Sequence, residues 1–298
     1  MSLNILELDE FITLNKLETP DPKIFNKIVN NLSFYKNELN EIENGNYERG
    51  ILLYSLIKKF KPKNILEFGT AYGFGTSSMS YAINENDNDA KIYTIDYLRH
   101  KESIKHVRMV ENEAKDEITT REKLLIKTIP KKWLNSITFL EGYSGEIYHK
   151  HNLPKIDFFY IDASHFYEAV KHDFFISVLL SNSSSIFVLD DYIDIENFGI
   201  KKLVDNELLK HIEITLIKTD RRNNSEIKIN NIKTDYGMCF FKIEQKKILE
   251  IFKEEEINLF LKKYKNFERR YGIRKKLNKK IPFLEKIKFR KILNLSRN

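Results

Sequence analysis

Apolar and polar positions follow two kinds of pattern along the chain, and these patterns predict strands and helices in alternation. Short apolar runs bounded by turn residues are typical of buried strands, whereas apolar residues three or four apart are typical of helices. The runs predict strands over residues 64–69, 91–96, 137–142, 156–162, 185–191, 213–218 and 237–243. Strands that are apolar throughout and alternate with helices predict an α/β fold, with a parallel sheet covered on both faces. No helix separates the last two strands, so we expect that pair to be antiparallel.

Helical patterns also flank this region. Residues 20–42 have helical spacing with Asp21 as the cap, residues 48–60 form a second helical pattern, and a long charged one covers roughly residues 100–128. The chain is therefore expected to divide into an N-terminal helical cap (1–47), an α/β domain (48–245) and a basic helical C-terminal extension (246–298).

The composition, with 42% hydrophobic and 31% charged residues, is typical of a soluble globular protein. The longest apolar run, Phe174 to Leu180, is too short to cross a bilayer. The N-terminal segment has no basic region followed by a long apolar stretch, which a secretory signal requires. Cys239 is the only cysteine, so an internal disulfide is excluded and a reducing compartment fits. We therefore expect a cytoplasmic protein.

The positive charge of the chain is concentrated at its C-terminal end. The net charge is +7, yet residues 258–298 contain 15 Lys or Arg against only Glu268 and Glu285. The rest of the chain is therefore mildly acidic. Three roles for this tail stay open: contact with an anionic membrane surface, binding of nucleic acid, or docking on the acidic body within one chain or across a homodimer.

Two observations favour docking of the tail over the other roles. The apolar residues of 281–295 spread around a helix instead of forming one stripe, which weakens the membrane interpretation. The sequence also has no Asn-Pro-Pro-Tyr motif of the kind found in base-modifying enzymes. Nucleic acid is therefore not the expected partner.

The segment NILEFGTAYGFGTSSMS, residues 64–80, combines a strand, a glycine-rich turn and the start of a helix. Gly69, Gly73 and Gly75 follow a G-x-x-x-G-x-G spacing, which differs from the G-x-G-x-x-G of dinucleotide binders. Glycines allow a ligand to approach the backbone closely. Glu67 beside the turn would repel a pyrophosphate but suits a cation, and S-adenosylmethionine carries both a sulfonium and an amino group. A glycine-rich turn without a ligand is the alternative.

Asp96 ends the next predicted strand. It follows the glycine turn by about 20 residues, where a carboxylate can accept hydrogen bonds from ribose hydroxyls. An aspartate that only caps a loop is the alternative. Together, Glu67 and Asp96 at adjacent strand ends favour an adenosine ligand that carries positive charge.

Four stretches, in order, resemble the successive motifs of class I S-adenosylmethionine-dependent methyltransferases. They are ILEFGTAYGFGTSSMSYAI, YTIDY, ITFLEGYSGEI and IDFFYIDASHFYEAVKHDF. The last two are particularly similar to methyltransferase family 24, which is related to the catechol and macrolide-sugar O-methyltransferases. The resemblance implies a Rossmann-like, seven-stranded, mostly parallel sheet with a final antiparallel strand, and S-adenosylmethionine as the cofactor.

The same resemblance implies which residues contact the cofactor. The methionine part would lie against Glu67 and the glycine turn, the ribose against Asp96, and the adenine against Tyr143 and Ser144. The full implied set is Glu67, Gly69, Thr70, Tyr72, Gly73, Gly75, Asp96, Tyr143, Ser144 and Asp162. The catechol-type enzymes have a serine where Gly75 stands, so Thr76 or Ser77 is expected to contact the cofactor carboxylate instead.

Asp162, Asp190 and Asp191 follow two predicted strands and would converge at one edge of the sheet if those strands are neighbours. Like charges at close range resist joint ionisation, and a hard cation such as Mg²⁺, which prefers oxygen ligands, would neutralise them. The metal-dependent relatives place ligands at matching positions, although the catechol type has Asp-Asn at the second strand. The alternative is that these aspartates only cap helices.

His165 lies three residues after Asp162, at the predicted start of a helix. An imidazole there could accept the hydroxyl proton as a general base, or it could be structural. Asp162 and His165 are the predicted catalytic residues. His172 is expected at the surface, and the HKH segment at 149–151 is expected to be a solvated loop.

The combined expectation is a methyltransferase that uses S-adenosylmethionine and a divalent cation to methylate a hydroxyl oxygen of a sugar or another small molecule. The expected partners are that acceptor, a second copy of the chain and an anionic membrane surface, at which the protein would be peripheral. Methylation of nitrogen or of RNA through the basic tail stays open, as does a non-catalytic protein that binds the cofactor as a partner.

Overall fold

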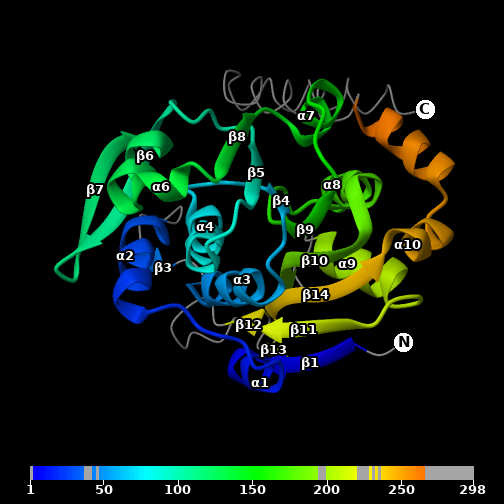
Figure 1. Ribbon diagram of the computed structural model, residues 1–298, viewed down its shortest axis with the longest axis horizontal. Coiled ribbons are helices and arrows are strands. Elements are labelled where there is room, and N and C mark those ends of the chain that lie inside the picture. The colour runs from blue at the N-terminus through cyan, green and yellow to red at the C-terminus, as the bar shows by residue number, and fades with distance from the viewer. Residues whose placement is uncertain are drawn as a thin grey trace.

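The computed structural model describes residues 3–36, 42–44, 47–193, 199–219, 228–229, 232–233 and 236–265. Its main feature is an eight-stranded sheet with the order β1-β11-β14-β10-β9-β4-β5-β8 (Figure 1). In that order the strands are β1 (Leu3–Glu7), β11 (Ile214–Lys218), β14 (Tyr236–Glu244), β10 (Ser181–Ile193), β9 (Ile156–Ile161), β4 (Asn64–Phe68), β5 (Lys91–Asp96) and β8 (Ile137–Glu141).

Strand β14 alone gives the sheet its antiparallel part. It runs antiparallel to both of its neighbours, β10 and β11, whereas the other neighbouring pairs of the sheet are parallel. The predicted α/β fold and its antiparallel final strand are therefore confirmed. The eighth strand is β1, which adds to the edge of the sheet with Leu3 paired to Ile214. It was not expected, because its five residues precede a segment with a helical pattern.

Helices cover both faces of the sheet. They are α1 (Leu8–Leu14), α2 (Pro22–Leu32), α3 (Tyr47–Phe60), α4 (Phe74–Asn86), α5 (Arg121–Thr128), α6 (Lys131–Leu134), α7 (Ser144–Lys150), α8 (Tyr167–Leu180), α9 (Gly199–Leu203) and α10 (Gln245–Ile251), with a π-helical turn at Val204–Leu208. Figure 1 shows α3 and α4 on one side of the sheet and α8 and α9 on the other.

Two apolar cores follow from the alternation of side chains along the central strands. In β9, Phe158 and Tyr160 belong to the core beneath α3 and α4, whereas Phe159 and Ile161 belong to the core beneath α8. Successive side chains of a strand point to opposite faces, so an uninterrupted apolar run is what a sheet covered on both sides requires.

The N-terminal segment combines helices with short strands. Helix α2 begins as predicted, because the Asp21 side chain accepts a hydrogen bond of 2.7 Å from the Lys23 backbone N–H. The helix ends at Leu32, however, well before residue 42. The chain then forms a small antiparallel pair, β2 (Phe34–Lys36) with β3 (Ile42–Asn44).

The long charged helix predicted for residues 100–128 is wrong over most of its length. An antiparallel hairpin forms instead from β6 (Ser103–Val110) and β7 (Glu113–Thr120), and only α5 after it is helical. Glu111 and Asn112 join the strands with φ of 52° and 65°, as a tight hairpin turn requires at both central positions. A further pair, β12 (Lys228–Ile229) with β13 (Ile232–Lys233), is also antiparallel.

The described start of the C-terminal extension packs on the body of the protein. Residues 254–265 are helical, and Ile257, Leu261 and Tyr264 of this helix are buried. Tyr264 contacts His172 with ring centroids 4.3 Å apart. His172 is therefore buried, and its expected surface position is wrong. Residues 266–298, which hold most of the basic tail, lie outside the described residues.

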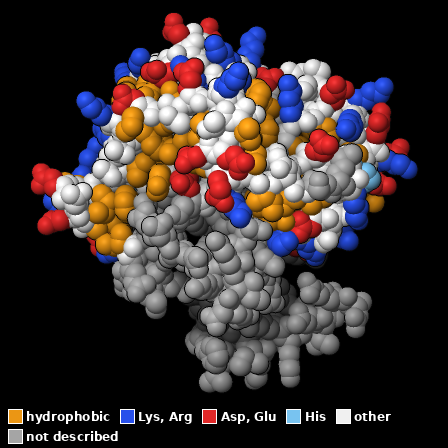
Figure 2. Space-filling view, turned by 90° about the horizontal axis from the view of Figure 1, so that it is seen from below, with side chains coloured by type: hydrophobic (Ala, Val, Ile, Leu, Met, Phe, Trp, Pro, Cys, Tyr) orange, Lys and Arg blue, Asp and Glu red, His pale blue; other side chains and the backbone are white. Residues whose placement is uncertain are grey.

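The surface of the described residues mixes apolar and charged side chains. Ile5 of β1 and Leu14 of α1 are exposed to 42% and 65% at the edge of the sheet. Figure 2, seen from that side, shows apolar side chains gathered in patches among Lys, Arg, Asp and Glu. Among the described residues, no helix has both the length and the apolar character that crossing a bilayer demands.

The aromatic stack around Phe187 should dominate the stability of the sheet. Phe187 is fully buried, and its ring lies 4.8, 5.7 and 5.1 Å from those of Phe159, Phe174 and Phe241. We expect Phe187→Ala to lower the free energy of unfolding by about 3–5 kcal/mol, measured by urea denaturation, because it leaves a cavity between two layers.

The exposed Leu14 of α1 provides the matched control for this truncation. Leu14→Ala should change the free energy of unfolding by no more than about 0.5 kcal/mol. Equal losses for both variants would contradict the two-layer core.

Candidate active site

A cavity of about 630 Å³ opens beyond the carboxyl ends of β4, β5, β8 and β9. This is where open α/β sheets bind their ligands. The sequence-predicted site residues that line it are Gly69, Tyr72, Asp96, Tyr143, Ser144, Asp162 and His165. Four strands therefore bring together residues that lie almost 100 positions apart.

The glycine turn brings the ends of β4 and β9 into direct backbone contact. Gly69 has φ of +93°, and a Cβ atom there would lie 2.2 Å from the backbone oxygen of Asp162. The Gly69 N–H donates to the Ile95 carbonyl oxygen at 2.9 Å, and the Asp162 N–H donates to that of Phe68 at the same distance. Only glycine fits this position, because any side chain would collide with the neighbouring strand end.

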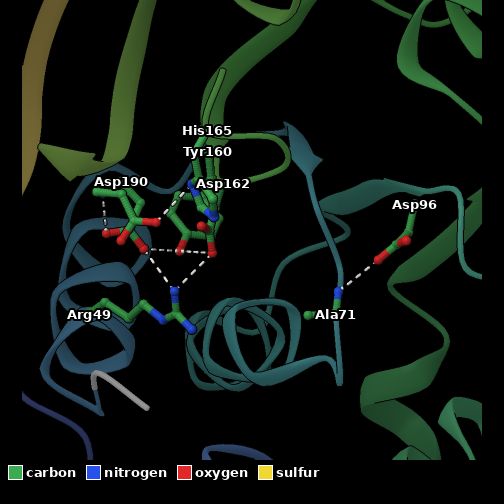
Figure 3. Close-up of polar contacts among 8 residues, drawn as sticks. Arg49, Ala71, Asp96, Tyr160, Asp162, His165 and Asp190 are labelled. Atoms are coloured by element: carbon green, nitrogen blue, oxygen red, sulfur yellow. Dashed lines mark hydrogen bonds and ion pairs between the residues drawn. The ribbon is translucent and has the colours of Figure 1, made fainter. Parts of the chain in front are cut away.

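Asp96 is held at the mouth of the cavity by three donors. Its carboxylate accepts a hydrogen bond of 2.8 Å from the backbone N–H of Ala71 (Figure 3). It accepts another of 2.7 Å from the backbone N–H of Leu98. Arg121 forms an ion pair with it at 2.9 Å and donates from Nε to the Ala71 carbonyl oxygen at 2.7 Å. Asp96 is therefore fixed in place against the glycine turn.

Arg121 is a site residue that the sequence analysis missed. It begins α5, inside the segment taken as one long helix, and only 2% of it is exposed. Burial lowers the pKa of its guanidinium, an effect that the Asp96 carboxylate opposes. In the sequence, Arg121 does not differ from the many other charged residues of this segment, so no local pattern marks it as part of the site.

Glu67 does not line the cavity. It is 1% exposed and lies beneath α4, where the absence of a side chain at Gly75 makes room for its carboxylate. The hydroxyl of Thr76 donates to it, and that of Thr94 does so at 2.6 Å. Burial raises the pKa of Glu67 to about 7, although these two hydroxyls lower it.

Three other residues of the implied cofactor set also stay outside the cavity lining: Thr70, Gly73 and Gly75. Thr70 is buried and shares a hydrogen bond of 2.6 Å with Thr94, next to Glu67. Gly73 has φ of +91° and caps α4. These residues support the turn from behind in this structure, and their direct contact with a cofactor stays a prediction.

Two aromatic rings also line the cavity. Tyr97 and Tyr143 have nearly parallel rings, 13° apart, with centroids at 6.2 Å. Ser144 begins α7 and donates a hydrogen bond to Asp173 of α8. Tyr97, Asp173 and Tyr264 also line the cavity and were not expected from the sequence.

A second, charged cavity of about 500 Å³ lies between β2 and the β6–β7 hairpin. Tyr72 lines both cavities, and its hydroxyl donates to the Lys105 carbonyl oxygen at 3.2 Å. The unexpected hairpin therefore forms part of the wall beside the glycine turn.

The three predicted metal ligands do meet at the sheet edge, but two of them hold an arginine. Nη1 of Arg49, from the first turn of α3, lies 2.9 Å from Oδ2 of Asp162 and 2.9 Å from Oδ2 of Asp190 (Figure 3). The Tyr160 hydroxyl lies 3.0 and 2.8 Å from the same two oxygens. Burial raises the pKa of Asp162, and Arg49 opposes that shift.

The third aspartate, Asp191, lies beside His165. The register of β10 against β14 shifts between Leu189 and Tyr192, and Asp191 adopts φ of +61°. Such a bulge re-aims side chains. Oδ2 of Asp191 lies 2.9 Å from Nδ1 of His165, and Asp191 is 1% exposed whereas the His165 side chain is 42% exposed at the cavity.

These contacts do not fit the predicted divalent ion. Within the part of the chain that the structure describes, no group of three or more His, Cys, Asp or Glu side chains is arranged to hold a metal. Asp162 and Asp190 already face a guanidinium, and Asp191 faces an imidazole. We therefore derive no chemical step through a metal.

The raised pKa of Glu67 generates a pH-dependent prediction. The folded protein keeps this proton between pH 4.5 and about 7, where the unfolded chain releases it, so this contribution to stability is lost as pH rises through that window. Glu67→Gln cannot ionise. We therefore expect the free energy of unfolding of Glu67→Gln to increase relative to that of wild type between pH 5 and pH 8, measured by urea denaturation.

The matched control for this titration is Glu146→Gln on α7, whose side chain is half exposed. A difference between Glu67→Gln and wild type that stays constant from pH 5 to pH 8 would show that Glu67 is ionised throughout.

Comparison with protein-family models agrees with the motifs. Residues 66–192 match a family model described as a methyltransferase domain, Methyltransf_24. No curated protein sequence matches the chain. Among solved structures, the O-methyltransferase TomG from Streptomyces achromogenes, in complex with SAM, is similar at 15% identity over 78% of this chain and 94% of that one, with a TM-score of 0.49.

An O-methyltransferase from Bacillus cereus in complex with SAH is similar at 14% identity over 80% of this chain and 96% of that one, with a TM-score of 0.48. At such identities and TM-scores, these two likenesses add nothing on activity. The family match spans β4 to β10 and so contains the glycine turn, Asp96, Asp162, His165 and the aspartate pair. Residues 66–192 therefore match a model of the family that the motifs resemble.

Proposed function

We propose that this protein transfers a methyl group from S-adenosylmethionine to a hydroxyl oxygen of a sugar or another small molecule. The observation that carries the proposal is the single cavity that joins the glycine turn and Asp96 to His165, which is backed by Asp191. Methylation of a hydroxyl needs a site for the methyl donor and a group that accepts the hydroxyl proton. This cavity offers both.

The cavity offers contacts suited to each part of the cofactor. The backbone at Gly69 is open to close approach, and the fixed carboxylate of Asp96 suits ribose hydroxyls. The nearly parallel rings of Tyr97 and Tyr143 suit a planar adenine. Asp162 in the lining favours the positive charge of the methionine and sulfonium part.

The reaction that these residues support is an in-line displacement. The acceptor oxygen attacks the methyl carbon, the carbon–sulfur bond breaks, and sulfur keeps the electron pair as neutral S-adenosylhomocysteine. Nδ1 of His165 lies 2.9 Å from Asp191, and when Nδ1 keeps the single proton of the neutral ring, Nε2 is the basic atom that takes the proton of the hydroxyl. Asp191 fixes the ring orientation and stabilises the imidazolium that forms.

Two rival functions remain predictions. Methylation of nitrogen or RNA through the basic tail depends mainly on residues 266–298, outside the described residues. The same holds for contact with a membrane surface. A homodimer and a cytoplasmic location are likewise expectations, and a non-catalytic cofactor-binding role is separated from catalysis by the experiments below.

Cofactor binding tests the donor half of the proposal. We expect wild type to bind one S-adenosylhomocysteine per chain in isothermal titration calorimetry. Asp96→Asn should weaken that binding at least about tenfold, because a hydrogen bond to a charged group is lost. The control is Asp116→Asn on the hairpin, a carboxylate whose side chain is 63% exposed. Absence of binding by wild type would refute the proposed function.

Acceptor chemistry tests the other half. S-Adenosylhomocysteine release is measured with simple glycosides and hydroxylated aromatics as probes, and the methylated atom is identified by NMR. We expect His165→Ala to lower kcat by about 10²–10⁴-fold while binding of S-adenosylhomocysteine stays unchanged. His149→Ala, in the HKH segment, is the control. Methylation found only on nitrogen would replace the proposal by its rival.

A further inference from the structure

We propose that Arg49 takes the place of a divalent cation in the carboxylate cluster, so that this methyltransferase works without a metal. The inference deepens the proposed function and rests on it. It assigns a role to a residue that precedes the domain matched by the family model, since that match begins at residue 66.

The geometry supplies the first argument. One atom, Nη1 of Arg49, lies 2.9 Å from a carboxylate oxygen of Asp162 and 2.9 Å from one of Asp190. The guanidinium therefore bridges the ends of β9 and β10, where a metal bound by these strands would have to lie. Figure 3 shows Arg49 reaching toward both carboxylates from the helix that faces them.

Charge supplies the second argument. The Asp190 side chain is fully buried, and those of Arg49 and Asp162 are only 17% and 16% exposed. Two carboxylates held this close need a compensating cation, and a guanidinium keeps its charge at any accessible pH. A divalent ion entering beside Arg49 would be repelled by the guanidinium that already lies between the two carboxylates.

The remaining oxygen contacts supply the third argument. Oδ1 of Asp190 accepts a hydrogen bond of 2.8 Å from the Asp191 backbone N–H. Oδ2 of Asp191 lies 2.9 Å from Nδ1 of His165. Magnesium demands six oxygen ligands in near-octahedral geometry, and binding it here would require several of these contacts to break together.

The acceptor class follows from this arrangement. A metal centre selects acceptors that offer two adjacent oxygens, because both can coordinate the ion. Here the only group assigned to the acceptor oxygen is His165, which needs one hydroxyl. An isolated hydroxyl should therefore suffice, and a vicinal pair should give no special advantage.

The decisive measurement is titration of the S-adenosylhomocysteine-loaded protein with Mn²⁺, followed by EPR. Wild type should bind no Mn²⁺ up to about 1 mM, the weak end of protein sites for hard cations. Arg49→Ala leaves the two carboxylates without their cation and should gain one Mn²⁺ site. Adding Asp190→Asn to Arg49→Ala should abolish that site. Arg108→Ala, which removes an arginine paired with Glu117 on the hairpin, should gain none.

Arg49→Lys keeps the positive charge and provides a variant that folds if the truncation does not. It should stay free of Mn²⁺, and whatever activity it keeps should be the same with and without EDTA, as that of wild type should. A tight Mn²⁺ site in wild type that Asp190→Asn abolishes would overturn the inference. So would a folded Arg49→Ala protein that gains no Mn²⁺.

Binding of S-adenosylhomocysteine, measured on the same samples, separates the two proposals. If wild type binds it and also binds Mn²⁺ at this cluster, only the role of Arg49 fails. If wild type binds no S-adenosylhomocysteine, the proposed function itself fails.

Discussion

The close backbone approach between Gly69 and Asp162 is the constraint on which the site depends. A side chain at position 69 would overlap the backbone of the neighbouring strand end, so the two strands could not finish side by side. With glycine there, the Asp162 N–H bonds to the Phe68 carbonyl and the Gly69 N–H bonds to that of Ile95. These bonds join β9, β4 and β5 at the point where each leaves the sheet, and Asp96 and Asp162 therefore face one cavity.

Around that contact, most of the buried carboxylates lie next to a basic side chain that offsets their charge. Arg121 pairs with Asp96, Arg49 pairs with both Asp162 and Asp190, and His165 pairs with Asp191. Glu67 has no such partner at ion-pair distance in the described contacts, and burial raises its pKa instead. An isolated buried charge is costly, so each carboxylate either gains a cation or holds its proton.

Both arginines come from segments outside the strand–helix core of the domain. Arg49 lies on α3, before the first central strand, and Arg121 lies after the unexpected hairpin. The core thus provides the acidic residues at the strand ends, and the flanking segments provide their counter-ions. Tyr264, from the helix at residues 254–265, is a further lining residue that comes from a flanking segment.

The sequence by itself determined the strand–helix alternation, the antiparallel final strand and the identity of the acidic strand ends, because these depend on local apolar runs and turn residues. It did not reveal the hairpin at 103–120, whose many charges obscured its period of two. Only the tertiary structure decided that Glu67 lies beneath the turn and that Arg49 and Arg121 face the carboxylates. Such pairings join residues up to 141 positions apart, and no local pattern specifies which cation meets which acid.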